Sequence, residues 1–84
     1  MNSHAALTLH GETLQVGART WSAHLLGAQT DAGLQCVRVA LHGVPTYTVL
    51  LKISPNTDNY EAVHALEWWL LSPGRENGDV IEVM

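Results

Sequence analysis

A chain of 84 residues suffices for one domain with a modest core, so we expect a single domain over residues 1–84. Hydrophobic residues make up 46% of the chain but charged residues only 14%, against about 25% in typical soluble domains. The low charge indicates either a surface partly covered by a partner, most simply a second copy, or a monomer whose surface consists of Thr, Gln, Asn and Ser. The net charge of −4 and only four basic residues oppose binding to a phosphate backbone, so we expect no nucleic-acid partner.

The first third of the chain predicts strands. In residues 5–17, apolar and polar residues alternate on both sides of Gly11-Glu12, so we expect a short hairpin that turns there. Residues 19–28 suit a strand or a helix, and we prefer a strand because a stable sheet needs three or more. Residues 29–33, QTDAG, predict a polar turn.

The strongest β pattern is a central hairpin over residues 34–54, two alternating runs joined by residues 43–45. A three-residue loop places Val39 opposite Val49 and collects the valines and leucines on one face. A four-residue loop would mix charged and apolar residues on both faces, so we choose the first register. It predicts one apolar face for a helix and one mixed face, which contains Cys36, for water or a partner.

The clearest helix spans about residues 56–72. Asp58, followed three residues later by Glu61, matches an N-cap with its capping-box partner, and Pro73 ends the helix. An alternative start has Ser54 as the cap.

A loop over residues 73–79 leads to a final short strand, Val80–Met84. A strand, the helix and this last strand together predict a β-α-β crossover. We therefore expect an α+β fold: a small two-layer sandwich in which a mainly antiparallel sheet, a meander with the central hairpin 34–54, packs on one C-terminal helix, about 56–72, and a short strand follows.

The helix has one face for the core and a second apolar surface. Trp69 falls on the core side, whereas Tyr60, His64 and Trp68 follow one another at four-residue intervals on the other side, with Leu71 close by. Tyrosine and tryptophan are enriched among residues that dominate binding energies. We expect these four residues to bind another protein or a second copy, giving a homodimer. The alternative for Trp68 is a boundary residue that covers the sheet edge.

The sequence contains no recognisable catalytic motif. Cys36 and the five histidines are the candidates for a small enzyme or a metal-binding protein, which is the alternative function. Their spacing contains neither a Cys-x-x-Cys pair nor two histidines four residues apart, and no serine lies in a Gly-x-Ser-x-Gly elbow. We expect no catalytic residue, no metal and no cofactor.

The compartment follows from cysteine use and hydropathy. A single cysteine excludes an intramolecular disulfide and fits a reducing compartment. No stretch of eighteen apolar residues occurs, and the N-terminus has no basic region followed by an apolar run. We expect a soluble cytoplasmic protein without a membrane partner.

Acidic residues gather in the C-terminal part. Residues 55–84 carry one basic and six acidic residues, whereas residues 1–54 carry three basic and two acidic ones. A weaker alternative function is therefore an acidic inhibitor that mimics nucleic acid. In topology alone, the meander followed by a helix resembles the second part of a double-stranded-RNA-binding domain. Residues 56–59, NTDN, stand where that family has a lysine-rich helix start, so the resemblance implies no RNA binding here.

Overall fold

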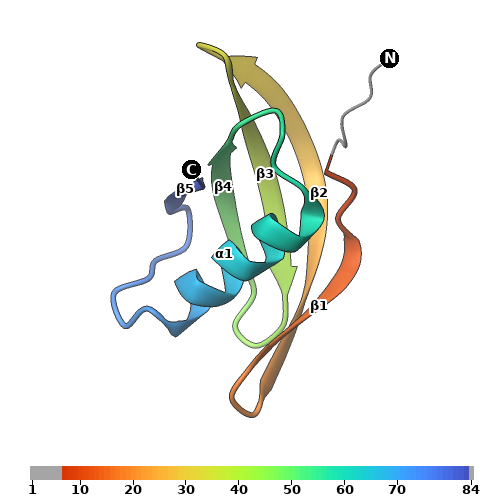
Figure 1. The fold of residues 1–84 in the computed structure, drawn as a ribbon. Coiled ribbons are helices and arrows are strands. Elements are labelled where there is room, and N and C mark those ends of the chain that lie inside the picture. The colour runs from red at the N-terminus through yellow and green to blue at the C-terminus, as the bar shows by residue number, and fades with distance from the viewer. Residues whose placement is uncertain (1–6, 84) are drawn as a thin grey trace.

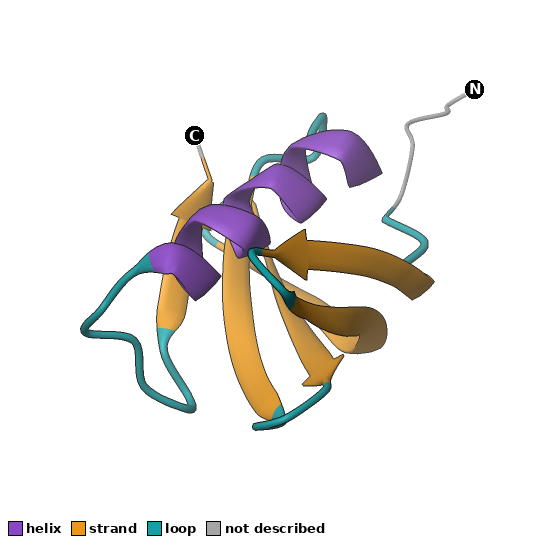
Figure 2. Cartoon of the chain, turned by 90° about the horizontal axis from the view of Figure 1, so that it is seen from below, coloured by secondary structure: helices purple, strands orange, loops and turns teal. Residues whose placement is uncertain are grey.

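A computed structural model describes residues 7–83, which form one five-stranded sheet and one helix. The strands lie in the order β1-β2-β3-β4-β5, antiparallel except for the parallel pair β4 and β5. The helix crosses one face of the sheet, so the fold has two layers (Figures 1 and 2). The predicted α+β fold is confirmed. The elements are β1 (His10–Val16), β2 (Arg19–Asp31), β3 (Leu34–His42), β4 (Tyr47–Ile53), α1 (Asn59–Leu71) and β5 (Val80–Val83).

The core lies between α1 and the sheet. Three helical residues, Ala62, Leu66 and Leu70, are buried against inward-facing strand residues such as Val39 and Leu51. Burying each large aliphatic side chain stabilises the fold by about 1.5–3 kcal/mol. This core holds α1 at a fixed position on the sheet.

The central hairpin has the predicted register. Val39 lies opposite Val49 and Leu41 opposite Tyr47. Val39, Leu41 and Val49 are buried on the helix side, because a strand places alternate residues on opposite faces.

The helix spans Asn59–Leu71, within the expected range of about 56–72, and the predicted N-cap at Asp58 is confirmed. The backbone N–H of Glu61 donates to the Asp58 side chain, and the Glu61 carboxylate accepts from the Asp58 N–H, which completes the capping box. Ser54 does not cap the helix; its carbonyl accepts from Thr57 N–H in the preceding turn. Reciprocal bonding at Asp58 satisfies two helix-end donors and explains the start.

The predicted hairpin within residues 5–17 is wrong. Gly11 and Glu12 lie inside β1, at a β-bulge that Gly11 accommodates with φ +96°. The turn follows β1 at Gly17-Ala18, and β1 pairs with β2. In this pairing Leu14 lies opposite Trp21, and both side chains are buried.

Residues 19–28 form a strand, as predicted, but β2 continues to Asp31. The turn is therefore shorter than the predicted 29–33 segment and consists of Ala32 and Gly33. Both have positive φ, 54° and 82°, as a tight two-residue hairpin requires.

The predicted crossover and final strand are both present. The chain leaves β4, passes through α1 and returns as β5, which lies parallel to β4 with Leu51 opposite Ile81. The strand spans Val80–Val83, and Met84 lies outside the described residues. This return places β5 at the end of the sheet and beside α1.

Candidate protein-binding groove

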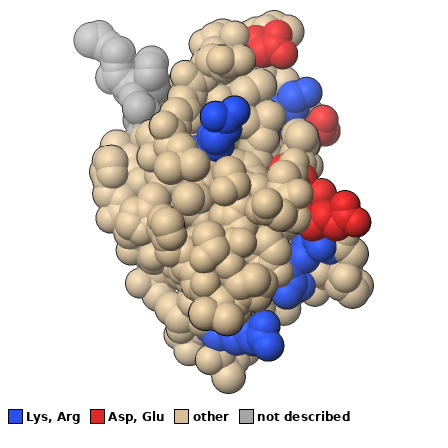
Figure 3. Space-filling view, turned by 180° about the vertical axis from the view of Figure 1, so that it is seen from behind, with Lys and Arg blue, Asp and Glu red and all other residues tan. Residues whose placement is uncertain are grey.

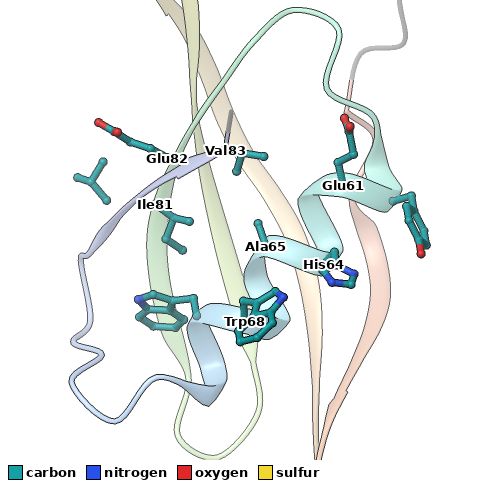
Figure 4. A pocket seen from close by; sticks show the side chains of 10 residues that line it. Glu61, His64, Ala65, Trp68, Ile81, Glu82 and Val83 are labelled. Atoms are coloured by element: carbon teal, nitrogen blue, oxygen red, sulfur yellow. The ribbon is translucent and has the colours of Figure 1, made fainter.

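An open groove of about 690 Å³ runs between α1 and β5 (Figure 4). One wall belongs to the exposed side of the helix and the other to the last strand. The groove exists because β5 returns beside the helix, and α1 covers only part of the sheet. The lining residues are Tyr60, Glu61, His64, Ala65, Trp68, Trp69, Val80, Ile81, Glu82 and Val83.

Large aromatic side chains form the helix wall. Trp68 is 66% exposed and Tyr60 77% exposed. The rings of Tyr60 and His64 lie 6.1 Å apart, as neighbours one helical turn apart do. An exposed tryptophan and an exposed tyrosine on one side of the helix leave apolar area in water, which a bound partner would remove.

Three of the four predicted binding residues, Tyr60, His64 and Trp68, line this groove together. Leu71 is 60% exposed but does not line it. It lies at the last position of α1, three residues beyond Trp68.

Sequence reasoning missed the strand wall of the groove. Ile81 and Val83 pack against the core and also line the groove. Their alternation with Val80 and Glu82 indicated a strand, but nothing local indicated that this strand would lie beside Trp68.

A hydrogen bond and a ring contact fix the position of the Trp69 side chain at one end of the groove. The indole N–H of Trp69 donates to Asp79 Oδ2 at 2.9 Å, and the ring meets Tyr47 edge-on with the centroids 5.0 Å apart. Trp69 is half-buried against the core, on the side of the helix that its spacing predicted. A partner would therefore meet a preformed surface here.

Asp79 is the last loop residue before β5 and accepts two hydrogen bonds there. Its carboxylate also accepts the backbone N–H of Glu76 at 2.9 Å. This backbone bond, followed by the bond from Trp69, lowers the pKa of Asp79 below its ordinary value of 3.8. Asp79 is consequently ionised at neutral pH, which keeps both bonds charge-assisted.

The charged side chains at the groove are both acidic. Glu61 comes from α1 and Glu82 from β5, on the two sides of the opening (Figure 4). Among the residues that the structure describes, no lysine or arginine lines the groove. The nearest basic partner of Glu82 in the sheet is Lys52, directly opposite it in β4. The groove thus combines an apolar surface with two acidic residues, Glu61 on the helix wall and Glu82 on the side of β5 that faces away from the helix.

Cys36 and the histidines do not form a common site in the described residues. Cys36 is buried, and the cavity that it lines contains no histidine. Within residues 7–83, no group of three or more potential metal ligands converges.

The sheet does bring two histidines together, however. His24 in β2 and His42 in β3 meet edge-on with their ring centroids 4.8 Å apart. The hydroxyl of Ser22 lies 3.1 Å from Nε2 of His24. Spacing along the chain gave no sign of this pair, because the two strands meet only through sheet register.

The face of the sheet away from α1 is mostly uncharged, with basic and acidic groups interspersed (Figure 3). Arg38 lies opposite Leu50, and Lys52 lies opposite Glu82, so cations interrupt the acidic residues here. Across residues 7–83, no helix has the length and apolarity that crossing a membrane demands.

Comparison with known proteins gives no match to a family model, a curated protein or a solved structure.

Proposed function

We propose that this chain is a small protein-binding module whose groove between α1 and β5 docks a partner protein. The observation that carries the proposal is Trp68, which is 66% exposed and stands with Tyr60 and His64 along one wall of a preformed groove. Anchors of this chemistry, surrounded by polar residues, dominate the energy of many interfaces.

Binding explains a feature that stability of the fold does not. The buried residues of α1 already join it to the sheet without Trp68, whose side chain projects away from them. An exposed tryptophan is costly in water and contributes little to the monomer. The proposal keeps the cytoplasm as the compartment, because Cys36 is a free thiol.

The direct test replaces Trp68 by alanine. Truncating an anchor residue costs about 2 kcal/mol or more of binding energy, which weakens affinity about 30-fold. Because Trp68 is exposed, the free energy of unfolding should change by less than about 0.5 kcal/mol. The matched control is Leu26→Ala on β2, where the leucine is 56% exposed and outside the groove.

The measurements are capture of proteins from an extract of the native cells on each immobilised variant, and the mass in solution by light scattering. A partner retained by the parent chain and by Leu26→Ala, but not by Trp68→Ala, supports the proposal. Equal retention on all three would reject it. A dimer mass that Trp68→Ala reduces to a monomer would identify a second copy as the partner.

A further inference from the structure

The last strand has a free edge next to the groove. β5 ends the sheet and pairs only with β4 among residues 7–83. Leu50 N–H donates to Asp79 C=O at 3.0 Å, so Asp79 points its carbonyl toward β4. Since successive residues of a strand direct their backbone groups to alternate edges, Ile81 also faces β4, while Val80 and Glu82 face outward. Two N–H donors and two C=O acceptors thus lie on the open side.

The groove reaches this edge. All four residues of β5 line it, although Ile81 and Val83 direct their side chains to the helix side and Val80 and Glu82 to the opposite side. Because the groove contacts residues whose side chains point to both faces of the sheet, it runs along the backbone edge of β5. An added strand would therefore extend the sheet and place every second side chain toward the aromatic wall of α1.

Building on the proposed function, we propose that the groove takes an extended apolar segment of another protein, flanked by lysine or arginine, which pairs with β5 as a sixth strand. Backbone bonds to Val80 and Glu82 would supply register, and alternate apolar side chains would cover Ile81, Val83 and Trp68. This is strand addition to an exposed sheet edge.

Charge selects this occupant over a second copy. Both charged groups of the groove, Glu61 and Glu82, are acidic. Two copies joined edge to edge at β5 would bring both pairs of glutamates into one interface, and like charges across an interface oppose binding. A segment with lysine or arginine beside its apolar residues instead places opposite charges at Glu61 and Glu82.

The test uses a display library of random twelve-residue peptides, selected on the full chain and counter-selected on Trp68→Ala. We expect the recovered peptides to have apolar residues at alternate positions and an excess of lysine and arginine. One representative is then synthesised in two forms, each N-methylated at alternate residues. One form should lose about tenfold or more in affinity, because its methyl groups block the bonds to β5, while the other changes little.

A matched pair of variants tests the same edge from the protein side. Val80→Pro removes an outward N–H without removing a bond to β4, and Val80→Ala keeps that N–H. We expect about tenfold weaker binding for the proline variant and a smaller change for the alanine variant. If Val80→Pro does not fold, the N-methylated peptides still decide the question. For charge, Glu82→Gln should weaken binding and its salt dependence, whereas Glu76→Gln, outside the groove, should not.

Other outcomes would overturn the inference in distinguishable ways. Peptides with apolar residues spaced by three and four, insensitive to N-methylation, would show a helix in the groove; protein binding would stand and strand addition would fall. Recovery of nothing that prefers the parent chain over Trp68→Ala would reject strand addition by a short segment, and capture from the extract on parent and Trp68→Ala would then decide the proposed function separately. A dimer that Val80→Pro converts to a monomer would put a second copy on β5 and overturn the choice of occupant.

Discussion

The two outer strands of the sheet differ in how their backbone edges are protected. Near the start of β1, Thr8 N–H donates to Asn59 Oδ1 at 3.0 Å and His10 N–H donates to Glu12 Oε1 at 2.8 Å. A β-bulge also interrupts this edge at Gly11. At β5, by contrast, the outward groups of Val80 and Glu82 have no neighbouring strand within the described residues.

This difference indicates which edge is available for a partner. Proteins commonly protect edge strands against unwanted pairing with bulges and side-chain bonds, and β1 has both devices. The edge without them borders the groove and the exposed aromatic wall. Strand addition at the start of β1 would have to break the bonds from Thr8 and His10, whereas the outward groups of β5 have no partner in the described residues.

Truncating one apolar side chain on each outer strand should reduce the free energy of unfolding more at β1 than at β5. Leu14 in β1 is fully buried, and Ile81 in β5 is half-buried. Leu14→Ala should reduce the free energy of unfolding by about 2–5 kcal/mol, because a buried cavity remains. Ile81→Ala should cost about 1 kcal/mol. Urea unfolding measures both, and equal losses would contradict the comparison.

The next largest effect concerns two asparagines whose side chains hydrogen-bond opposite parts of the sheet. Asn59 bonds Thr8 twice and Glu12 once, and Asn77 Oδ1 accepts the N–H of Thr48 at the start of β4. Asn59→Ala should cost about 1–2 kcal/mol, and Asn77→Ala about 0.5–1 kcal/mol. Urea unfolding compares the two variants. A larger loss of unfolding free energy for Asn77→Ala would contradict the stronger stabilisation expected at the β1 edge.

A smaller, pH-dependent effect is expected at Asp79, before β5. Asp79→Asn removes the charge from the acceptor of the Trp69 and Glu76 bonds, so thermal stability at pH 7 should fall. The folded-state pKa of Asp79 is lowered, so its contribution is complete above the ordinary value of 3.8 and is lost as pH falls through the folded value. The difference in Tm between parent and variant should therefore shrink below about pH 3.8. A constant difference would argue against a role for the charge.

The last prediction requires no substitution and concerns hydrogen exchange of the backbone amides in the parent chain. Val80 and Glu82 should exchange fast and Ile81 and Val83 slowly, since only the latter two face β4. The amides of Thr8 and His10, bonded to side chains, should be better protected than those of Val80 and Glu82. Uniform protection along β5 would mean that its outer edge is already paired.

The helix and central hairpin were predictable because their signals are local. Asp58 and Glu61 lie three residues apart, and each bonds the backbone of the other, so the capping box involves only neighbouring residues. The register around Val39 and Val49 follows from side-chain alternation and a short loop. The helix wall of the groove, Tyr60, His64 and Trp68, was predictable for the same reason, as one side of an amphipathic helix.

Sequence by itself therefore determined the helix and the central hairpin, whose signals lie in neighbouring residues, and the aromatic side of α1. Tertiary structure alone decided that Gly11 forms a bulge rather than a turn, that His24 meets His42, and that β5 lies beside Trp68. The physical reason is shared by all three. Each depends on which distant strands pair and in what register, and that choice is made by burial of the common core rather than by the residues at those positions.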